Sequence, residues 1–324
     1  MLAKIFLLRA IRFKALFVLS CLYTSIACGQ DRVVMPLRNN YPLALMHSSF
    51  RADTAQLIAA DSQQLSALWS WSNTLSLHQQ GTFLIDAESR ILDLYFKYGL
   101  SQNLELSFFL PLVWLGSGQL DPLIDDWHKT FGLPRGNRDQ ILDGGFEFFG
   151  ETNEGDTFSL SPGGARLGLP EVAFKYPASQ SLSFVFSTAF PLQGGYLGNT
   201  GIDLGVGALY DFDFEEFKFS SGVSARYFTD QKSYELIFPE MLYEAFLSSS
   251  YPLTDKLYFA VQIMFHSALS ENIKYFPDYG TYLDTGFRYV FSDSISLDLI
   301  LRENPAPRRG TTDVTFSLGL NYKL

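Results

Sequence analysis

Alternation of apolar with polar residues is the feature that most limits what this chain can fold into. It is clearest in the last segment, where successive residues belong to two different rows. The rows are Val314, Phe316, Leu318, Leu320, Tyr322 and Leu324 against Asp313, Thr315, Ser317, Gly319, Asn321 and Lys323. Because successive residues of a strand point to opposite faces, this segment is predicted to be a strand with one wholly apolar face.

Twelve segments of the chain have this strand character. They are 65–77, 89–99, 103–116, 168–177, 181–192, 201–211, 217–228, 241–251, 256–269, 280–291, 295–303 and 312–324. Each has about the length of a tilted membrane-spanning strand, which takes about nine to eleven residues. Short turns follow the even-numbered segments and longer connections follow the odd-numbered ones, the longest being 117–167.

This alternation of connections is typical of outer-membrane barrels, which have short periplasmic turns and long external loops. After the first thirty residues no run of about eighteen apolar residues occurs, which argues against membrane-spanning helices. We therefore predict an all-β fold, an antiparallel transmembrane β-barrel of about twelve strands, with fourteen as the alternative count. The less favoured alternative is a soluble exported β protein. The predicted parts are a signal (1–27), an arm (28–63) and the barrel (64–324).

The first residues resemble a secretory signal. Four basic residues precede the apolar run 15–22, which is too short to span a bilayer. Small residues place cleavage after Ala27 or after Gly29. Cleavage after Ala27 would leave Cys28 for lipidation, although Ser25 departs from the usual lipobox, and both alternatives stay open. Sec-type export and insertion into a Gram-negative outer membrane follow from this signal together with the strand pattern.

Charge and cysteine content exclude several classes of partner. The net charge of −10 becomes −14 once the first 27 residues are removed, so a nucleic-acid partner is not expected. The mature chain has at most one cysteine and therefore no intramolecular disulfide. No phosphate-binding glycine motif or zinc motif occurs, and no cofactor is predicted. The expected partners are outer-membrane lipid and lipopolysaccharide, with the oligomeric state left open.

The C-terminus carries a candidate sorting signal. Gly319, Tyr322 and Leu324 resemble the terminal strand signal that the barrel assembly machinery reads, although the chain ends on Leu rather than Phe. The assembly machinery is therefore a predicted partner during biogenesis.

The arm 28–63 shows no clear period. Pro36 and Pro42 interrupt it, while 54–65 has the composition of a short helix. We expect it to lie in the periplasm or to insert into the barrel.

A helix is predicted inside the longest connection, within 120–137. Asp121 is a suitable cap, Pro122 suits the first helical position, and Gly132 followed by Pro134 ends the helix.

One face of this helix is apolar, because Leu123, Ile124, Trp127 and Phe131 are three or four residues apart. We expect this stripe to cover the barrel mouth as a lid, with Trp127 buried.

Charged side chains fall in the row that faces the lumen. They are Asp93, Lys97, Glu105, Glu171, Lys175, Asp203, Lys218, Arg226, Glu244, Asp284, Arg288, Asp298 and Arg302. One interpretation is a bracing network inside a filled barrel, since mixed buried charges are costly unless paired. The other is a solute path whose selectivity these charges set.

Catalytic signals are weak. His266 beside Ser267 is the only pair that resembles outer-membrane lipid hydrolases, but Ala268 and Leu269 stand where the nucleophile is expected. Adjacent strand residues also point to opposite faces, which separates the pair. His266 is thus only a weak catalytic candidate.

Metal signals are weak as well. Asp121, Asp125, Asp126 and His128 are candidate ligands, but they lack the spacing and the central glycine of a calcium loop.

Several stretches resemble the DUF3187 family of uncharacterised proteobacterial proteins. The resembling stretches are 36–43, 86–88, 98–100, 121–128, 131–138, 266–268 and 312–316. The chain departs from the family at 303–304 and 163–165. The resemblance implies an exported, porin-like barrel and no reaction. The predicted function is a passive channel or a structural surface barrel, with an outer-membrane lipid-modifying hydrolase as the alternative.

Overall fold

The computed structural model describes residues 32–78, 81–132, 144–161, 163–191, 200–305 and 310–324. The side chains of Trp127, His128 and Phe131 lie outside this description, as do the signal, its cleavage sites and Cys28. The chain divides into the units 1–32 and 33–324, and the second unit contains every helix and strand named in this article. In the described ranges, no helix has the length and apolar character needed to cross a membrane.

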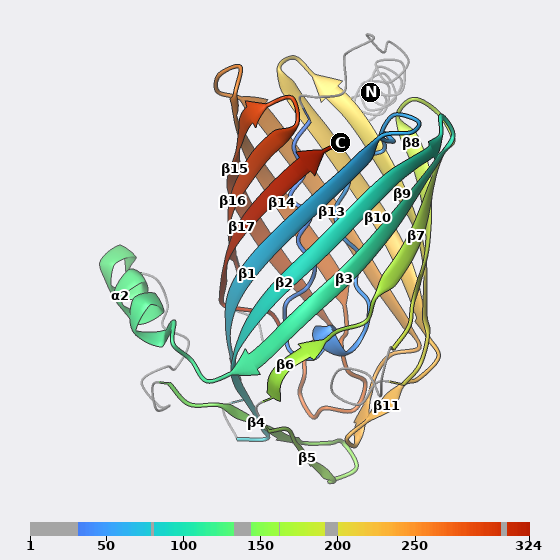
Figure 1. Cartoon of the computed structure of the whole chain (residues 1–324). Coiled ribbons are helices and arrows are strands. Elements are labelled where there is room, and N and C mark those ends of the chain that lie inside the picture. The colour runs from blue at the N-terminus through green and yellow to red at the C-terminus, as the bar shows by residue number, and fades with distance from the viewer. Residues whose placement is uncertain (1–31, 79–80, 133–143, 162, 192–199, 306–309) are drawn as a thin grey trace, which may run out of the picture. The chain divides into compact units, whose positions relative to one another are not determined.

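Twelve antiparallel strands form one closed barrel, as predicted (Figure 1). They are β1 (Gln63–Leu77), β2 (Phe83–Ser101), β3 (Leu104–Gly116), β7 (Glu171–Pro177), β8 (Leu182–Ala189), β9 (Asp203–Phe214), β10 (Phe217–Phe228), β13 (Met241–Pro252), β14 (Leu257–Ser267), β15 (Tyr279–Ser292), β16 (Ile295–Glu303) and β17 (Val314–Lys323). The first and last strands close the barrel, with Leu65 opposite Tyr322 and Asn73 opposite Val314.

The longest predicted loop, 117–167, contains more structure than expected. It holds the helix α2 (Asp121–Phe131) and the short strands β4 (Glu147–Glu151), β5 (Thr157–Ser159) and β6 (Gly163–Leu167). Because β4 pairs with Phe83–Asp86, β2 begins six residues before its predicted start. A second small hairpin joins β11 (Lys232–Ser233) and β12 (Leu236–Ile237).

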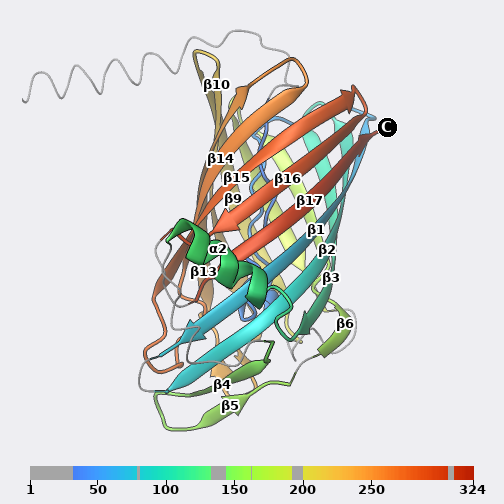
Figure 2. The same cartoon turned by 90° about the vertical axis from the view of Figure 1, so that its left-hand side faces the viewer.

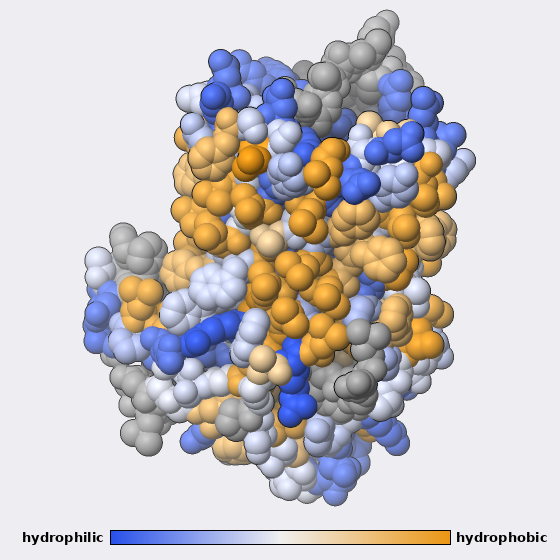
Figure 3. All heavy atoms as spheres, viewed as in Figure 1, coloured by the Kyte–Doolittle hydropathy of each residue, from blue (hydrophilic) through white to orange (hydrophobic). Residues whose placement is uncertain are grey.

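The outer face of the barrel is apolar. Alternate residues of the strands leave large side chains exposed, among them Trp69, Phe186, Val223, Leu299 and Leu318. On the face shown in Figure 3, hydrophobic residues form an orange belt across the barrel, with hydrophilic residues gathered toward both ends. A contiguous apolar belt of this kind is typical of closed barrels that span a membrane.

The two ends of the barrel differ. Gln63 and Leu324 lie at one end together with the short turns, and we call this the terminal end. The opposite end carries the longer connections and is called the far end. In Figure 1 the terminal end is at the top.

Residues 33–62, here called the inner segment, run inside the barrel (blue thread in Figure 1). The amide nitrogen of Val33 lies 3.1 Å from Ser250 Oγ at the terminal end. The chain then turns at the far end through the 3-10 helix η1 (Ala44–Met46) and returns, so that Asp61 N donates to Gly99 O at 2.8 Å. The helix expected over 54–65 is absent, because the main chain here bonds to the wall instead of to itself.

Gly99 marks the point where the inner segment leaves the barrel. A methyl group there would collide with the carbonyl group of Ala59. We expect Gly99→Ala to cost about 1–3 kcal/mol of unfolding free energy, as overpacking of a tight contact does. The matched control is Gly116→Ala on β3, where an added methyl meets no atom within 4 Å. Thermal unfolding in detergent compares the two variants, and equal midpoints would contradict the expectation.

Candidate functional site

The inward face of the wall carries many polar side chains beside apolar ones. Buried hydroxyl and amide side chains line it on strands from all around the barrel. They include Ser66, Ser70, Ser72, Thr74, Ser76, Ser183, Ser220, Ser224, Ser248, Ser250, Gln262, Thr315, Ser317 and Asn321. Such a wall resembles the lining of a water-filled pore more than the inner face of an apolar core. In this structure the inner segment occupies the space that the wall encloses.

Four wall carboxylates hold the returning half of the inner segment by its main chain. Asp203 Oδ2 accepts from the amide of Ser48 at 2.6 Å and Glu244 Oε2 from that of Phe50 at 2.6 Å. Nearer the terminal end, Asp211 accepts from Ala55 at 3.0 Å and Glu105 from Ile58 at 2.9 Å. Carboxylates that accept main-chain N–H groups form charge-assisted bonds, which are stronger than neutral ones.

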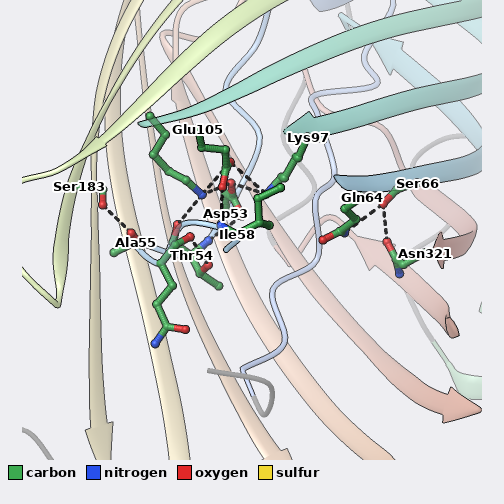
Figure 4. Close-up of polar contacts among 12 residues, drawn as sticks. Asp53, Thr54, Ala55, Ile58, Gln64, Ser66, Lys97, Glu105, Ser183 and Asn321 are labelled. Atoms are coloured by element: carbon green, nitrogen blue, oxygen red, sulfur yellow. Dashed lines mark hydrogen bonds and ion pairs between the residues drawn. The ribbon is translucent and has the colours of Figure 1, made fainter. Parts of the chain in front are cut away.

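A buried ion cluster fixes Asp53 between two strands (Figure 4). Its Oδ2 lies 2.7 Å from Lys97 Nζ on β2 and 3.0 Å from Lys175 Nζ on β7. Both lysines also face Glu105, at 3.9 and 3.1 Å. Ser183 on β8 binds the segment two residues after Asp53, because its hydroxyl donates to the carbonyl of Ala55 at 2.5 Å.

A second cluster lies between Arg51 and β10. Arg51 donates to Glu171 Oε1 at 3.0 Å, and its guanidinium group stacks on the ring of Phe109 at 3.5 Å. Arg226 donates to the other oxygen of Glu171 at 3.0 Å and to Ser48 Oγ at 2.9 Å, and lies 3.5 Å from Glu244. Wall and segment thus share one charge network.

The entering half of the segment is bound through its carbonyl groups. Gln262 Nε2 donates to the carbonyl of Met35 at 3.0 Å. Arg302 donates to Asp284 at 2.6 and 2.9 Å and to the carbonyl of Arg38 at 2.5 Å, and both partners of the Arg302–Asp284 pair are fully buried.

The turn of the inner segment is packed by aromatic residues. Tyr41 and Met46 join Phe83, Phe228, Phe238 and their neighbours in one buried cluster at the far end. The ring of His47 stacks on Phe228 with centroids 3.9 Å apart, and its Nδ1 lies 3.2 Å from Asp203 Oδ1. The segment is therefore held by apolar contacts at its turn and by both polar and apolar contacts along its two arms.

The remaining predicted lumen charges also face inward. Arg288 pairs with Asp298 at 2.6 and 2.7 Å. Lys218 is at the terminal rim, 2.9 Å from Asp213. Asp93 is buried and its Oδ1 lacks a hydrogen-bond partner among the described residues.

The catalytic candidate His266 points away from the lipid. It is buried on the inward row, its Nδ1 is 2.8 Å from the carbonyl oxygen of Ser267, and its ring lies beside Tyr282. The Ser267 hydroxyl accepts from the amide of Tyr243 at 3.0 Å. This arrangement gives no nucleophile and base facing a lipid ester.

The metal candidates are spread along α2 and do not converge. Asp121 accepts from Asn73 Nδ2 at 2.8 Å and from the amide of Gly144 at 2.9 Å, and Asp125 pairs with Lys129 at 2.5 Å. Within the described ranges no group of three or more acidic, histidine or cysteine residues is placed to hold a metal. That finding includes Asp126, while the side chain of His128 lies outside the description.

The lid expectation for α2 needs correction. The helix has its predicted bounds and Gly132 follows it with φ +65°, but it lies on the outer wall (Figure 2). Leu120 and Ile124 pack on Val314, Leu301 and Trp71, which belong to the outward rows of β17, β16 and β1. Leu123 is exposed, and the side chains of Trp127 and Phe131 are not described. An apolar stripe fits any apolar surface, and here that surface is the outside of the barrel.

Polar contacts fix the start of α2 to the same outer surface. Glu88 on β2 accepts from the amides of Gln119 at 2.6 Å and Leu120 at 2.8 Å. The helix begins at Asp121, and the amide of Ile124 donates to Leu120 O at 2.9 Å, so Leu120 rather than Asp121 stands at the cap position.

The residues of the candidate sorting signal lie at the closing seam. Tyr322 and Leu324 are exposed on the terminal side, and Gly319 faces inward beside Asp298 and Leu68. Their recognition by an assembly machinery stays a prediction.

Sequence reasoning missed the inner-segment residues Arg38, His47, Arg51 and Asp53. A signal was nevertheless present. The inward rows carry more acidic than basic side chains, and such an imbalance predicts that further N–H donors reach the lumen.

A closed antiparallel barrel with an apolar outer belt, a polar wall and a segment inside it has the architecture of outer-membrane channel proteins. The chain belongs to the DUF3187 family, described as proteins of unknown function, whose model matches residues 16–324. No curated protein matches it.

Three solved structures of low sequence identity are similar to this chain, and the first of them shares its fold. A COG4313 outer membrane channel from Pseudomonas putida F1 is similar with a TM-score of 0.54 and 13% identity, covering 85% of this chain and 100% of the channel. The NanC porin gives a TM-score of 0.47 and 10% identity, over 80% of this chain and 100% of the porin. A mutant of the TodX monoaromatic hydrocarbon channel gives a TM-score of 0.42 and 12% identity, over 82% of this chain and 90% of the channel.

Proposed function

We propose that this protein is an outer-membrane channel and that the structure represents its closed state, with the inner segment as the plug. The observation that carries the proposal is the pairing of a polar wall with a plug held along both arms by hydrogen bonds and ion pairs. Contacts of this kind can be exchanged for water, whereas the wall of a permanent core would be apolar.

The path of the inner segment favours opening from the terminal end. Both of its ends leave the barrel there, so the segment is a loop that can be withdrawn without passing through the barrel. With the apolar belt in the membrane, the terminal end would face the periplasm, as in barrels with an even number of strands. The proposal includes Sec-type export, and outer-membrane lipid, lipopolysaccharide and the assembly machinery as partners.

The test uses a variant that loosens the plug without changing the wall. Asp53→Asn removes the charge that binds Lys97 and Lys175, and both lysines keep Glu105 as a wall partner. We expect conductance steps in planar bilayers to become about tenfold or more frequent, since about 1.4 kcal/mol of lost plug binding is sufficient.

The matched control is Asp61→Asn, which removes the same charge from the exposed end of the same segment. It should behave as the unmodified protein. Absence of any conductance in Asp53→Asn, with a folded barrel verified by its heat-dependent gel mobility, would overturn the channel and leave a structural barrel.

A further inference from the structure

Taken without the inner segment, the wall has an excess of negative charge. Between the rims of the described barrel, eight carboxylates and five basic side chains face the lumen. The carboxylates are Asp93, Glu105, Glu171, Asp203, Asp211, Glu244, Asp284 and Asp298, and the bases are Lys97, Lys175, Arg226, Arg288 and Arg302. The rim pair Asp213 and Lys218 adds no net charge.

Four of the five wall bases do not need the inner segment for neutralisation. They have wall carboxylates of their own, in pairs no longer than 3.1 Å. The pairs are Arg226–Glu171, Lys175–Glu105, Arg302–Asp284 and Arg288–Asp298. Withdrawal of the segment therefore leaves these four pairs intact.

Several of the carboxylates instead depend on the segment. Asp203 is bonded to His47 Nδ1 at 3.2 Å and to the amide of Ser48 at 2.6 Å. Arg51 of the segment donates to Glu171 Oε1 at 3.0 Å, and Asp93 is buried with one oxygen that lacks a hydrogen-bond partner among the described residues. The closed state thus shows what these wall carboxylates bind: N–H donors and a guanidinium group.

Resting on the proposed channel function, we infer that the open lumen is selective for cations, and that its solutes are small organic cations with amine or guanidinium groups. Such a solute replaces the N–H donors and the guanidinium group that the plug presents to Asp203, Glu244 and Glu171. Anions meet a wall whose excess charge repels them, because rings of acidic side chains favour cations in pores.

The selectivity is measured on the Asp53→Asn channel, whose wall charges are unchanged. In a potassium chloride gradient we expect a reversal potential that corresponds to a potassium-to-chloride permeability ratio of roughly ten. Replacing potassium chloride by guanidinium chloride should sustain the current.

Two further variants make the test specific. The first is the triple variant Asp53→Asn, Asp93→Asn and Asp203→Asn, which should lose most of the potassium-to-chloride permeability ratio. The second is the double variant Asp53→Asn and Asp255→Asn, which should retain this ratio because Asp255 lies in the exposed turn between β13 and β14. Steady conductance with a ratio at or below one would overturn the inference and leave the channel standing. No conductance in any variant would instead overturn the channel itself.

Discussion

A disulfide formed by the substitutions Ala55→Cys and Ser183→Cys will close the Asp53→Asn channel, and reduction of this disulfide will reopen the channel. The carbonyl of Ala55 and the hydroxyl of Ser183 are 2.5 Å apart, so plug and wall run side by side at this point (Figure 4). A bond there prevents withdrawal of the returning half of the segment. The expected result is loss of the conductance steps under oxidising conditions and their full return with a thiol reductant.

The controls are the two single variants Ala55→Cys and Ser183→Cys, each in the Asp53→Asn background. Cys21→Ser and Cys28→Ser are added to every variant, so that no other cysteine is present. Neither single variant should respond to oxidation. A cross-linked protein that conducts as well as the reduced one would show that solutes pass without displacement of the plug.

The largest expected loss of stability comes from Arg302→Ala. Arg302 and Asp284 are fully buried, and the same guanidinium group holds the carbonyl of Arg38. Removing one partner of a buried pair leaves an uncompensated charge and costs about 3–5 kcal/mol. We expect the temperature at which the folded gel band converts to the unfolded band to fall accordingly.

Arg288→Ala is the matched comparison, because Arg288 makes the same two-bond pair with Asp298 while its side chain is 21% exposed. Because the Arg288 side chain is partly solvated, we expect Arg288→Ala to cost less stability than Arg302→Ala. Equal transition temperatures for the two variants would show that the Arg302–Asp284 pair is not a determinant of stability.

Local patterns were sufficient to predict the wall. The predicted ranges 217–228 and 295–303 coincide with β10 and β16, because a two-residue period specifies both the strand and its outward row. The helix α2 was also predictable from local residues, since Pro122 suits its first turn and Gly132 its end, although Leu120 rather than Asp121 stands at the cap position.

Long-range partners were not predictable. The extension of β2 to Phe83 depends on β4, more than sixty residues away, and no property of residues 83–88 reveals it. The stripe of α2 indicated an apolar contact but not whether Ile124 would meet the mouth or the outer row of β17. The inner segment lacks any period because its hydrogen bonds go to the wall rather than to itself.

The position of the inner segment also has a kinetic consequence. Its bonds reach across most of the chain: Arg38 and Arg302 are 264 residues apart, and Val33 and Ser250 are 217 apart. Contacts at such sequence separation form slowly, because the intervening chain must first be ordered. The entering half of the segment is bonded mainly to β13, β14, β15 and β16, so it gains most of its partners only after these strands have joined the wall. The most N-terminal part of the barrel unit is therefore among the last to reach its place, and the folding barrel passes through a state in which its lumen is only half filled.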